Sequence, residues 1–310
     1  MSDLKQGMRQ KAQELGIDLI GFGAKERFAA LEPRHNPFTI FPEGETVILV
    51  GQMIPRGAIR GLEEGTNTGD YGSFGYSWLD NQFLAQSTYD IVRFLEDDGW
   101  EACPIFPNPL STGGWGVPVA EGREPPNVTP DFDYAAVACG LGEVGFSGEI
   151  LTPRFGPRQR FALVLTDAPM DADPLLEAPV CIRCGKCAQV CPLHALDADG
   201  AETLHICGRE MPVAGQNLDL CARCANGATA EKLVTQDRAP TDRNIYSSRG
   251  AVSAFGRVDR LAALCTRTCI HAMEEARAVE NLFEQNFRKR DAWGKNEFGE
   301  AVAVAKGGKQ

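Results

Sequence analysis

The spacing of hydrophobic residues predicts alternating helices and strands over the first half of the chain. Residues 1–16 repeat apolar side chains at helical spacing, so we expect an amphipathic helix there. Its apolar face carries Leu4, Met8, Ala12 and Leu15. Continuous apolar runs at 17–23 and 46–54 predict two buried strands.

The same alternation continues through the following residues. Residues 81–100 predict a helix that ends near Gly99, because glycine readily adopts the conformation that closes a helix. The inner stripe of this helix is Leu84, Thr88, Ile91 and Leu95. Three further elements follow in chain order: a strand over 100–106, a short helix over 132–142 and a strand over 160–170. The alternation predicts an α/β domain over residues 1–175.

The other residues divide into a long loop, a cysteine-bearing unit and a tail. Residues 107–130 are rich in proline and glycine and show no period, which is typical of a lid or a ligand-lining loop. We expect residues 176–275 to form the cysteine-bearing domain. Residues 276–310 are expected to form a C-terminal helix and a polar tail, with the helical pattern running over 272–290.

Composition adds an unusual use of cysteine to this picture. The chain has 310 residues, 24% of them charged, and a net charge of −11, which disfavours a polyanionic partner such as tRNA. No apolar run is long enough to span a membrane, and the N-terminal segment lacks the apolar core of an export signal. We therefore expect a cytoplasmic location. Of the eleven cysteines, nine lie between positions 181 and 269, which predicts metal or redox chemistry rather than disulfides.

Residues 140–145 read G-L-G-E-V-G, a pattern shared with dinucleotide-binding turns. Such a turn must open a helix whose N-terminus binds the pyrophosphate. Pro153 and Pro157 exclude a helix of three turns after these glycines, because proline lacks a backbone donor and clashes with the preceding turn. The turn instead predicts close approach of the backbone to a flat or bulky ligand.

Residues 181–192 contain the most specific motif of the chain. Its cysteines follow the spacing C-x2-C-x2-C-x3-C-P, which binds [4Fe–4S] clusters in bacterial ferredoxins. The members are Cys181, Cys184, Cys187 and Cys191. In that arrangement the first three thiolates bind one cluster and the fourth binds a second cluster. Structural zinc usually needs two separated C-x2-C pairs, so we expect iron–sulfur chemistry.

The second cluster needs three more cysteines beside Cys191. We expect them to be Cys207, Cys221 and Cys224. The first cluster lacks a local fourth ligand, because Ala228 stands where a two-cluster ferredoxin has cysteine. Either Cys265 or Cys269 then completes the first cluster, and the sequence does not choose between them. A zinc site formed by these two cysteines with His271 is the alternative.

Two segments resemble the superfamily of cobalamin-dependent reductive dehalogenases and epoxyqueuosine reductases. Residues 138–170 read ACGLGEVGFSGEILTPRFGPRQRFALVLTDAPM, and residues 181–192 read CIRCGKCAQVCP. They are similar to the glycine turn, the T-P-x-F-G-P-R-x-R segment and the cluster motif of that superfamily. The match is close over residues 131–192. The resemblance implies a nitroreductase-like α/β domain that holds cobalamin base-off, followed by a two-cluster ferredoxin-like module.

The resemblance also implies where the cofactor lies. The corrin ring would sit beside the glycine turn, where the small residues let the backbone approach it. The cofactor-binding residues would be Cys139, Gly140, Leu141, Gly142, Gly145, Phe146, Ser147 and Gly148. Electrons would pass through two clusters to cobalt, and a nearby acid would supply a proton. The candidate catalytic residues are Tyr134, Asp131, Asp133 and Arg160.

The chain departs from the epoxyqueuosine reductases at two places. Their D-T-A-P segment, whose aspartate is the proton donor, corresponds here to N-V-T-P with Asn127. Their G-K-N-T segment corresponds to G-F-S-G, with Phe146 and Ser147. Together with the net charge, these departures favour a small organic substrate over tRNA.

We therefore expect a cobalamin-dependent iron–sulfur reductase that performs reductive dehalogenation or a related reductive cleavage. Its expected electron donor is a ferredoxin, a flavodoxin or a reductase, and a homodimer is one expected assembly. Two alternatives stay open. One is an electron-transfer iron–sulfur protein without cobalamin, with or without a flavin; the other is a tRNA-modifying enzyme similar to epoxyqueuosine reductase.

Overall fold

The structure is a computed structural model that describes residues 3–105, 117–126, 128–227 and 260–304. The residues group into two compact units. The α/β unit contains Met1–Met53, Asp80–Leu141 and Arg160–Glu177, and the cysteine unit contains Ile54–Leu79, Gly142–Gln159 and Ala178–Gln310. Unlike the predicted domains over 1–175, 176–275 and 276–310, these units are not contiguous in sequence, because two early segments group with the cysteines.

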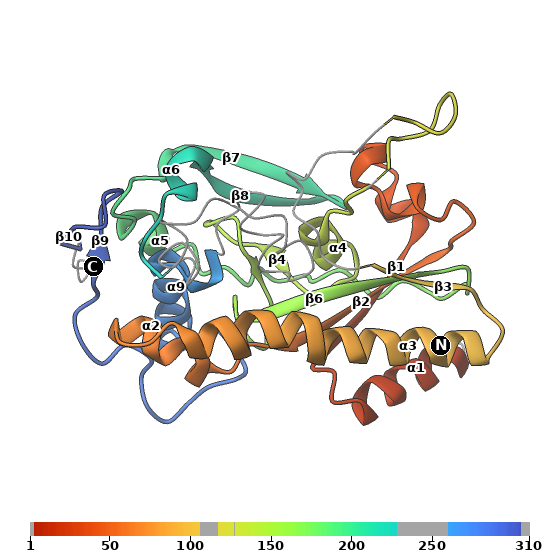
Figure 1. Cartoon of the computed structure of the whole chain (residues 1–310), viewed down its shortest axis with the longest axis horizontal. Coiled ribbons are helices and arrows are strands. Elements are labelled where there is room, and N and C mark those ends of the chain that lie inside the picture. The colour runs from red at the N-terminus through yellow and green to blue at the C-terminus, as the bar shows by residue number, and fades with distance from the viewer. Residues whose placement is uncertain (1–2, 106–116, 127, 228–259, 305–310) are drawn as a thin grey trace. The chain divides into compact units, whose positions relative to one another are not determined.

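The α/β unit is built on a four-stranded sheet of order β1-β2-β6-β3 (Figure 1). Its strands are β1 (Leu19–Ala24), β2 (Thr46–Met53), β3 (Ala102–Ile105) and β6 (Gln159–Thr166). Strand β1 pairs with β2, and β3 pairs with β6, both in antiparallel orientation. The four strands lie where the apolar runs predicted them, which confirms a mixed α/β fold.

Helices α1 (Asp3–Glu14) and α3 (Ala85–Asp97) pack against each other on one face of this sheet (Figure 1). Side chains alternate along β2, so Ile48 and Val50 face these helices while the residues between them face the opposite side. The core between the layers includes Met8, Ala12, Phe22, Ile91, Leu95 and Val164. These contacts confirm the predicted apolar faces of both helices.

Helix α3 stops where glycine was expected to stop it. Gly99 has a φ of 89°, and its N–H donates to the carbonyl of Glu96 at 3.0 Å. Before α3 the chain forms two π-helical stretches, η5 (Tyr71–Ser77) and η6 (Leu79–Leu84). The predicted helix over 81–100 therefore begins in irregular helical backbone and becomes a regular α-helix only at Ala85.

Helix α4 (Phe132–Ala138) contacts β1 and β2 of the same sheet. A Cβ added at Gly21 of β1 would lie 2.5 Å from the carbonyl oxygen of Cys139, so only glycine lets the end of α4 approach the strand. Gly140 follows with a φ of 71°, and an added Cβ there would overlap the carbonyl oxygen of Pro174. This glycine is therefore required for both backbone conformation and space.

Gly140→Ala is expected to destabilise the protein by clearly more than Gly16→Ala. Both glycines have left-handed φ values, 71° and 69°, but a Cβ at Gly16 meets nothing within 4 Å. Conformational strain alone costs about 1–2 kcal/mol at such a position, and Gly140→Ala adds the clash with Pro174. Chemical denaturation of both variants measures the difference. Equal losses of unfolding free energy would show that the loop at Pro174 yields without cost.

The cysteine unit consists of short elements. Its strands are β4 (Glu143–Val144), β5 (Ile150–Leu151), β7 (Leu196–Ile206), β8 (Arg209–Gln216), β9 (Gly294–Lys295) and β10 (Ala301–Val302). They pair as three antiparallel two-stranded ribbons, β4 with β5, β7 with β8 and β9 with β10. The α-helices among its described residues are α2 (Arg60–Glu64), α5 (Lys186–Gln189), α6 (Leu218–Ala222) and α9 (Leu264–Glu275).

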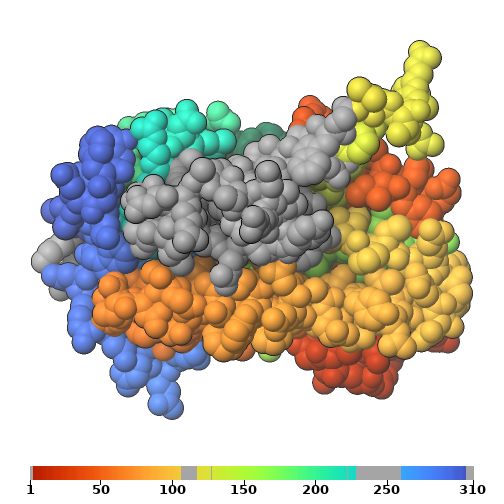
Figure 2. Space-filling model, viewed as in Figure 1, coloured from red at the N-terminus to blue at the C-terminus, as the bar shows by residue number. Residues whose placement is uncertain are grey.

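Short 3-10 turns occur in both units. They are η1 (Lys25–Phe28), η2 (Pro33–His35), η3 (Pro37–Thr39), η4 (Arg56–Ile59) and η9 (Arg260–Ala262). Of the predicted loop over 107–130, the described residues 117–126 and 128–130 contain no helix or strand. Figure 2 shows the stretch 117–126 projecting from the surface in yellow, with Val117 and Val119 mostly exposed. In the described ranges, no helix has both the length and the apolar character to cross a membrane.

The predicted C-terminal helix over 272–290 is wrong over most of its length. Helix α9 ends at Glu275, and Arg277 has a φ of 53° that does not continue a helix. Phe287 is instead fully buried in a core with Leu62 and Ile270. Tertiary packing of this segment therefore overrides its local helical pattern.

Candidate iron–sulfur centre

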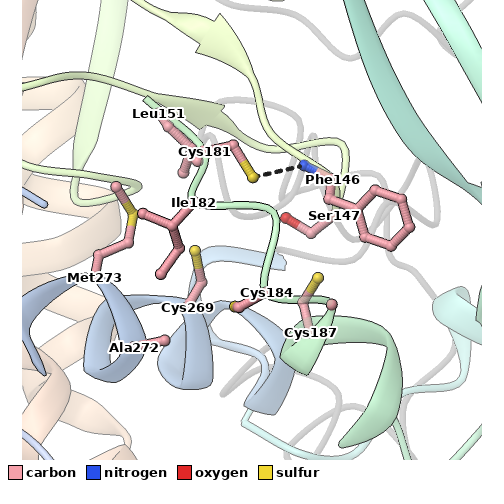
Figure 3. A pocket seen from close by; sticks show the side chains of 11 residues that line it. Phe146, Ser147, Leu151, Cys181, Ile182, Cys184, Cys187, Cys269, Ala272 and Met273 are labelled. Carbon is pink, nitrogen blue, oxygen red and sulfur yellow. Dashed lines mark hydrogen bonds between the residues drawn. The ribbon is translucent and has the colours of Figure 1, made fainter. Parts of the chain in front are cut away.

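The ferredoxin-type motif folds as a tight loop followed by the short helix α5. Arg183 and Gly185 adopt left-handed φ values of 51° and 66°, which turn the chain sharply between the cysteines. Cys181, Cys184 and Cys187 line one pocket, together with Phe146, Ser147 and Met273 (Figure 3).

Helix α9 supplies the fourth thiol of this pocket. Figure 3 shows Cys269 projecting from α9 toward the motif loop, and it lines the same pocket. Burial raises the pKa of Cys269 well above its ordinary value, and the thiols of Cys187, Cys181 and Cys184 raise it further. We call these four residues the first cysteine group.

Four other cysteines form a second set of neighbours. The pKa of Cys221 is raised to about 11, chiefly by burial; the charge of Arg260 lowers it in part, and the thiols of Cys224 and Cys191 contribute to the rise. Burial also raises the pKa of Cys265, and the same two thiols act on it. We call Cys191, Cys221, Cys224 and Cys265 the second cysteine group. Cys265 and Cys269 lie one turn apart on α9, so this helix contributes one thiol to each group.

The donor chemistry of both groups fits an iron–sulfur cluster. Burial raises the pKa of Cys187 to about 12, so this thiol stays protonated at neutral pH unless a metal binds it. A coordinating metal ion removes the thiol proton, and four thiolates are the ligand set of a [4Fe–4S] cluster. Such thiolates bind to different irons and need not converge on one point.

Hydrogen bonds to sulfur support the same chemistry. The Phe146 N–H donates to Cys181 Sγ at 3.5 Å, and the Ala195 N–H donates to Cys191 Sγ at 3.3 Å. Asn226 Nδ2 lies 3.6 Å from Cys224 Sγ. Donors to ligand sulfurs stabilise the thiolate form and tune the potential of a cluster.

The described residues do not have the geometry of the alternative zinc site formed by Cys265, Cys269 and His271. In the part of the chain that the structure describes, no three histidine, cysteine or carboxylate side chains are arranged around a single metal ion. Cys265, Cys269 and His271 are among these described residues. Ala228 and Asn127, on which two sequence arguments depended, lie outside the described residues.

Cys207 lies apart from the second group, although the sequence placed it there. It occupies the turn between β7 and β8, whose register pairs Ile206 with Arg209 at that end and Leu196 with Gln216 at the other. Cys191 and Cys221 adjoin the Leu196 end. A strand of 11 residues spans on the order of 30 Å, so this hairpin holds Cys207 away from Cys191. The structure brings Cys265 to the second group instead.

The glycine turn forms a hairpin rather than a helix, as the prolines predicted. Glu143 and Val144 pair with Leu151 and Ile150. A Cβ added at Gly142 would lie 2.7 Å from the carbonyl oxygen of Leu151. At Gly145 it would lie 2.6 Å from Leu151 Cδ1, and at Gly148 it would overlap Gln216. The glycines therefore make room for neighbouring atoms of the protein itself, and their role in binding a corrin ring stays a prediction.

The other predicted cofactor-binding residues of this segment are also packed within their units. Cys139 is fully buried against the sheet, and its Sγ lies 3.8 Å from the carbonyl oxygen of Val47. The Leu141 side chain packs against Gly21 of β1. The Ser147 carbonyl accepts a hydrogen bond from Arg260 Nη1 at 3.1 Å.

The candidate catalytic residues all make structural contacts in the α/β unit. Asp131 caps α4 by accepting a hydrogen bond from the Tyr134 N–H at 2.9 Å. The Tyr134 hydroxyl donates to the Arg27 carbonyl at 2.7 Å, and Asp133 lies half-buried in the first turn of α4. Arg160 Nη1 lies 3.6 Å from Asp80 Oδ2. Their catalytic roles stay predictions.

A buried ionic network, which no local sequence pattern predicted, surrounds α9. Glu63 accepts hydrogen bonds from Arg267 Nη1 at 2.6 Å and from Arg288 Nε at 2.5 Å. Arg267 is fully buried, donates to the Asn226 carbonyl at 3.1 Å and lies 4.7 Å from the Trp293 ring centre. Because Arg267 lies between Cys265 and Cys269, this network fixes the helix that serves both groups. No local pattern connects residues so distant in sequence.

Comparison with known proteins agrees with this centre. The 4Fe-4S binding domain family matches residues 180–197. Tetrachloroethene reductive dehalogenase of Dehalobacter restrictus is 34% identical over 116 residues, 36% of this chain and 17% of that protein. Epoxyqueuosine reductase of Synechococcus is 29% identical over 195 residues, 61% of this chain and 52% of that protein.

A solved structure extends the likeness to the whole fold. It is a reductive dehalogenase, described as suggesting a mechanism for B12-dependent dehalogenation. It covers 98% of this chain and 41% of its own chain, with 17% sequence identity and a TM-score of 0.50.

The fold and the thiol groups define an iron–sulfur protein with a ferredoxin-type motif. Its sequence is similar to both reductive dehalogenases and epoxyqueuosine reductases, in agreement with the resemblance found in the sequence. It spans about half or less of the length of these curated relatives.

Proposed function

We propose that this protein is an oxidoreductase that holds two [4Fe–4S] clusters and transfers electrons to a small organic substrate through cobalamin. The observation that carries the proposal is the assembly of eight cysteines into two groups of four. The first group would hold one cluster through Cys181, Cys184, Cys187 and Cys269. The second group would hold the other through Cys191, Cys221, Cys224 and Cys265.

When bound, the clusters supply one-electron transfer. The chain contributes the orientation of the thiolates and their electrostatic surroundings. The N–H groups of Phe146 and Ala195 hold two of the sulfurs, one in each group. Arg260 opposes the effect of burial on the pKa of Cys221, because its positive charge favours the thiolate.

Cobalamin is supported by the relatives rather than by the glycine turn. The solved reductive dehalogenase is described as B12-dependent, and the sequence resemblance implies the same cofactor. Reductive dehalogenation or a related reductive cleavage is the reaction class that this likeness favours. A ferredoxin, a flavodoxin or a reductase is the electron donor that we propose, since each can deliver single electrons to iron–sulfur centres.

Protein purified without oxygen, from cells supplied with cobalamin, tests the proposal. We expect about eight iron and eight sulfide ions per chain and the visible absorption bands of base-off cobalamin. Values near four of each would contradict two clusters. Full iron content with flavin bands, or with no second chromophore, would instead favour the electron-transfer alternative.

A further inference from the structure

The hairpin that follows α4 carries two carboxylates, one beside each cysteine group. Glu143 lies on β4 and is fully buried. Its Oε1 accepts a hydrogen bond from the Cys181 N–H at 2.6 Å. Three residues later the Phe146 N–H donates to the sulfur of the same cysteine. The hairpin thus contacts both the backbone N–H and the thiol of Cys181, the first cysteine of the motif.

Two arginines complete the surroundings of this buried carboxylate. Arg209 Nη2 lies 3.1 Å from Glu143 Oε2, and Arg183 Nη2 lies 3.5 Å from Oε1. Arg183 also donates to the Pro212 carbonyl at 2.8 Å, which fixes its guanidinium. A negative charge and its counter-charges are therefore fixed next to Cys181.

Glu149, at the other end of the hairpin, forms a similar arrangement with the second group. Its Oε1 lies 2.7 Å from Arg260 Nε, and both side chains are mostly buried. Arg260 also donates to the carbonyls of Ser147 and Gly148, at 3.1 and 3.0 Å. Arg260 Nη1 also donates to Gln216 Oε1 at 2.9 Å, and Gln216 is followed directly by the cap of helix α6, which carries Cys221. Arg260 begins the 3-10 turn η9 that leads into α9 and Cys265. This ion pair therefore lies close to the second group.

We propose that the hairpin Glu143–Leu151 sets the reduction potentials of the two clusters separately, through Glu143 at the first cysteine group and Glu149 at the second. This inference rests on the proposed function, because it needs both clusters. Reduction adds one electron to a cluster, and a fixed negative charge nearby disfavours that electron. Glu143 is in addition a positioning residue, since it holds the backbone of Cys181.

Redox titration followed by electron paramagnetic resonance tests the inference on the anaerobically purified holoprotein. The two cluster signals are first assigned by their selective loss in Cys269→Ser and Cys265→Ser. Glu143→Gln keeps an oxygen that accepts the Cys181 N–H and removes the charge. It should favour reduction of the first cluster by roughly tenfold, which is a rise of about 59 mV for one electron. Glu149→Gln should raise the potential of the second cluster and leave the first unchanged.

Arg209→Gln supplies a test of opposite sign. It leaves the Glu143 charge less compensated, so the potential of the first cluster should fall. If Glu143→Gln fails to assemble the first cluster, the direction of the Arg209→Gln shift decides alone. The inference would be overturned if the reduction potentials did not shift, or if both clusters shifted equally. It would also be overturned if Glu143→Gln and Arg209→Gln shifted the potential of the first cluster in the same direction. A wild-type protein with fewer than two cluster signals would overturn the proposed function and this inference with it.

Discussion

Cys269→Ser is expected to remove about half of the iron from the anaerobically purified protein, whereas Cys207→Ser is expected to leave the iron content unchanged. Cys269 lines the pocket of the first cysteine group, and its thiol is buried beside three others. Serine cannot replace it well, because soft thiolate is the ligand that iron–sulfur clusters require. Cys207 lies in the turn between β7 and β8, away from the second group.

Cys265→Ser completes this comparison. It should also remove about half of the iron, but it should abolish the other cluster signal. Iron and sulfide analysis with electron paramagnetic resonance measures all three variants under the same conditions. The opposite result would be loss of a cluster in Cys207→Ser and full iron content in Cys265→Ser. It would support the ligand set predicted from the sequence, in which Cys207 rather than Cys265 binds the second cluster.

Arg267→Met is expected to lower the free energy of unfolding by about 3–5 kcal/mol, because it leaves buried Glu63 with one cation fewer. The two side chains are 0% and 4% exposed, and they lie 2.6 Å apart. The change also removes the hydrogen bond to the Asn226 carbonyl. Chemical denaturation without oxygen measures the loss, and iron analysis shows whether both groups suffer from it.

Arg290→Met is the matched control. Arg290 pairs with Glu64, but its side chain is 75% exposed, and exposed ion pairs contribute about 0–1 kcal/mol. This variant should therefore stay close to the wild type. Similar losses in both variants would show that burial of the Glu63 network adds nothing to its contribution.

The elements of the α/β unit could be predicted because their signals are local. The apolar runs of β1 and β2, the helical spacing in α1 and the closing glycine at position 99 each act within a few residues. The tail after α9 could not be predicted in the same way. Its charged and apolar side chains resemble a helix locally, but Phe287 and Arg288 contact α2 and α9 instead.

For the candidate iron–sulfur centre too, local patterns were predictive and long-range contacts were not. The motif at 181–191 predicts four ligands from spacing alone, since one short segment of the chain carries them. The choice between Cys265 and Cys269 was open because both lie on the same face of one helix, and each thiol belongs to a different group. Cys207 was grouped by its sequence position between Cys191 and Cys221. In the structure, the hairpin of β7 and β8 instead holds Cys207 at a distance from Cys191 and Cys221.

The position of helix α9 late in the chain determines when the two proposed clusters can assemble during translation. The motif loop leaves the ribosome early and already presents three thiols of one group, but the last thiol of each group lies on α9, more than 70 residues later. Neither proposed cluster can be completed before that helix has emerged and docked. A nascent chain would expose partial sites that are vulnerable to oxygen and to the wrong metal. Delivery of iron and sulfide to this protein is therefore expected to follow translation of α9 rather than to accompany that of the motif.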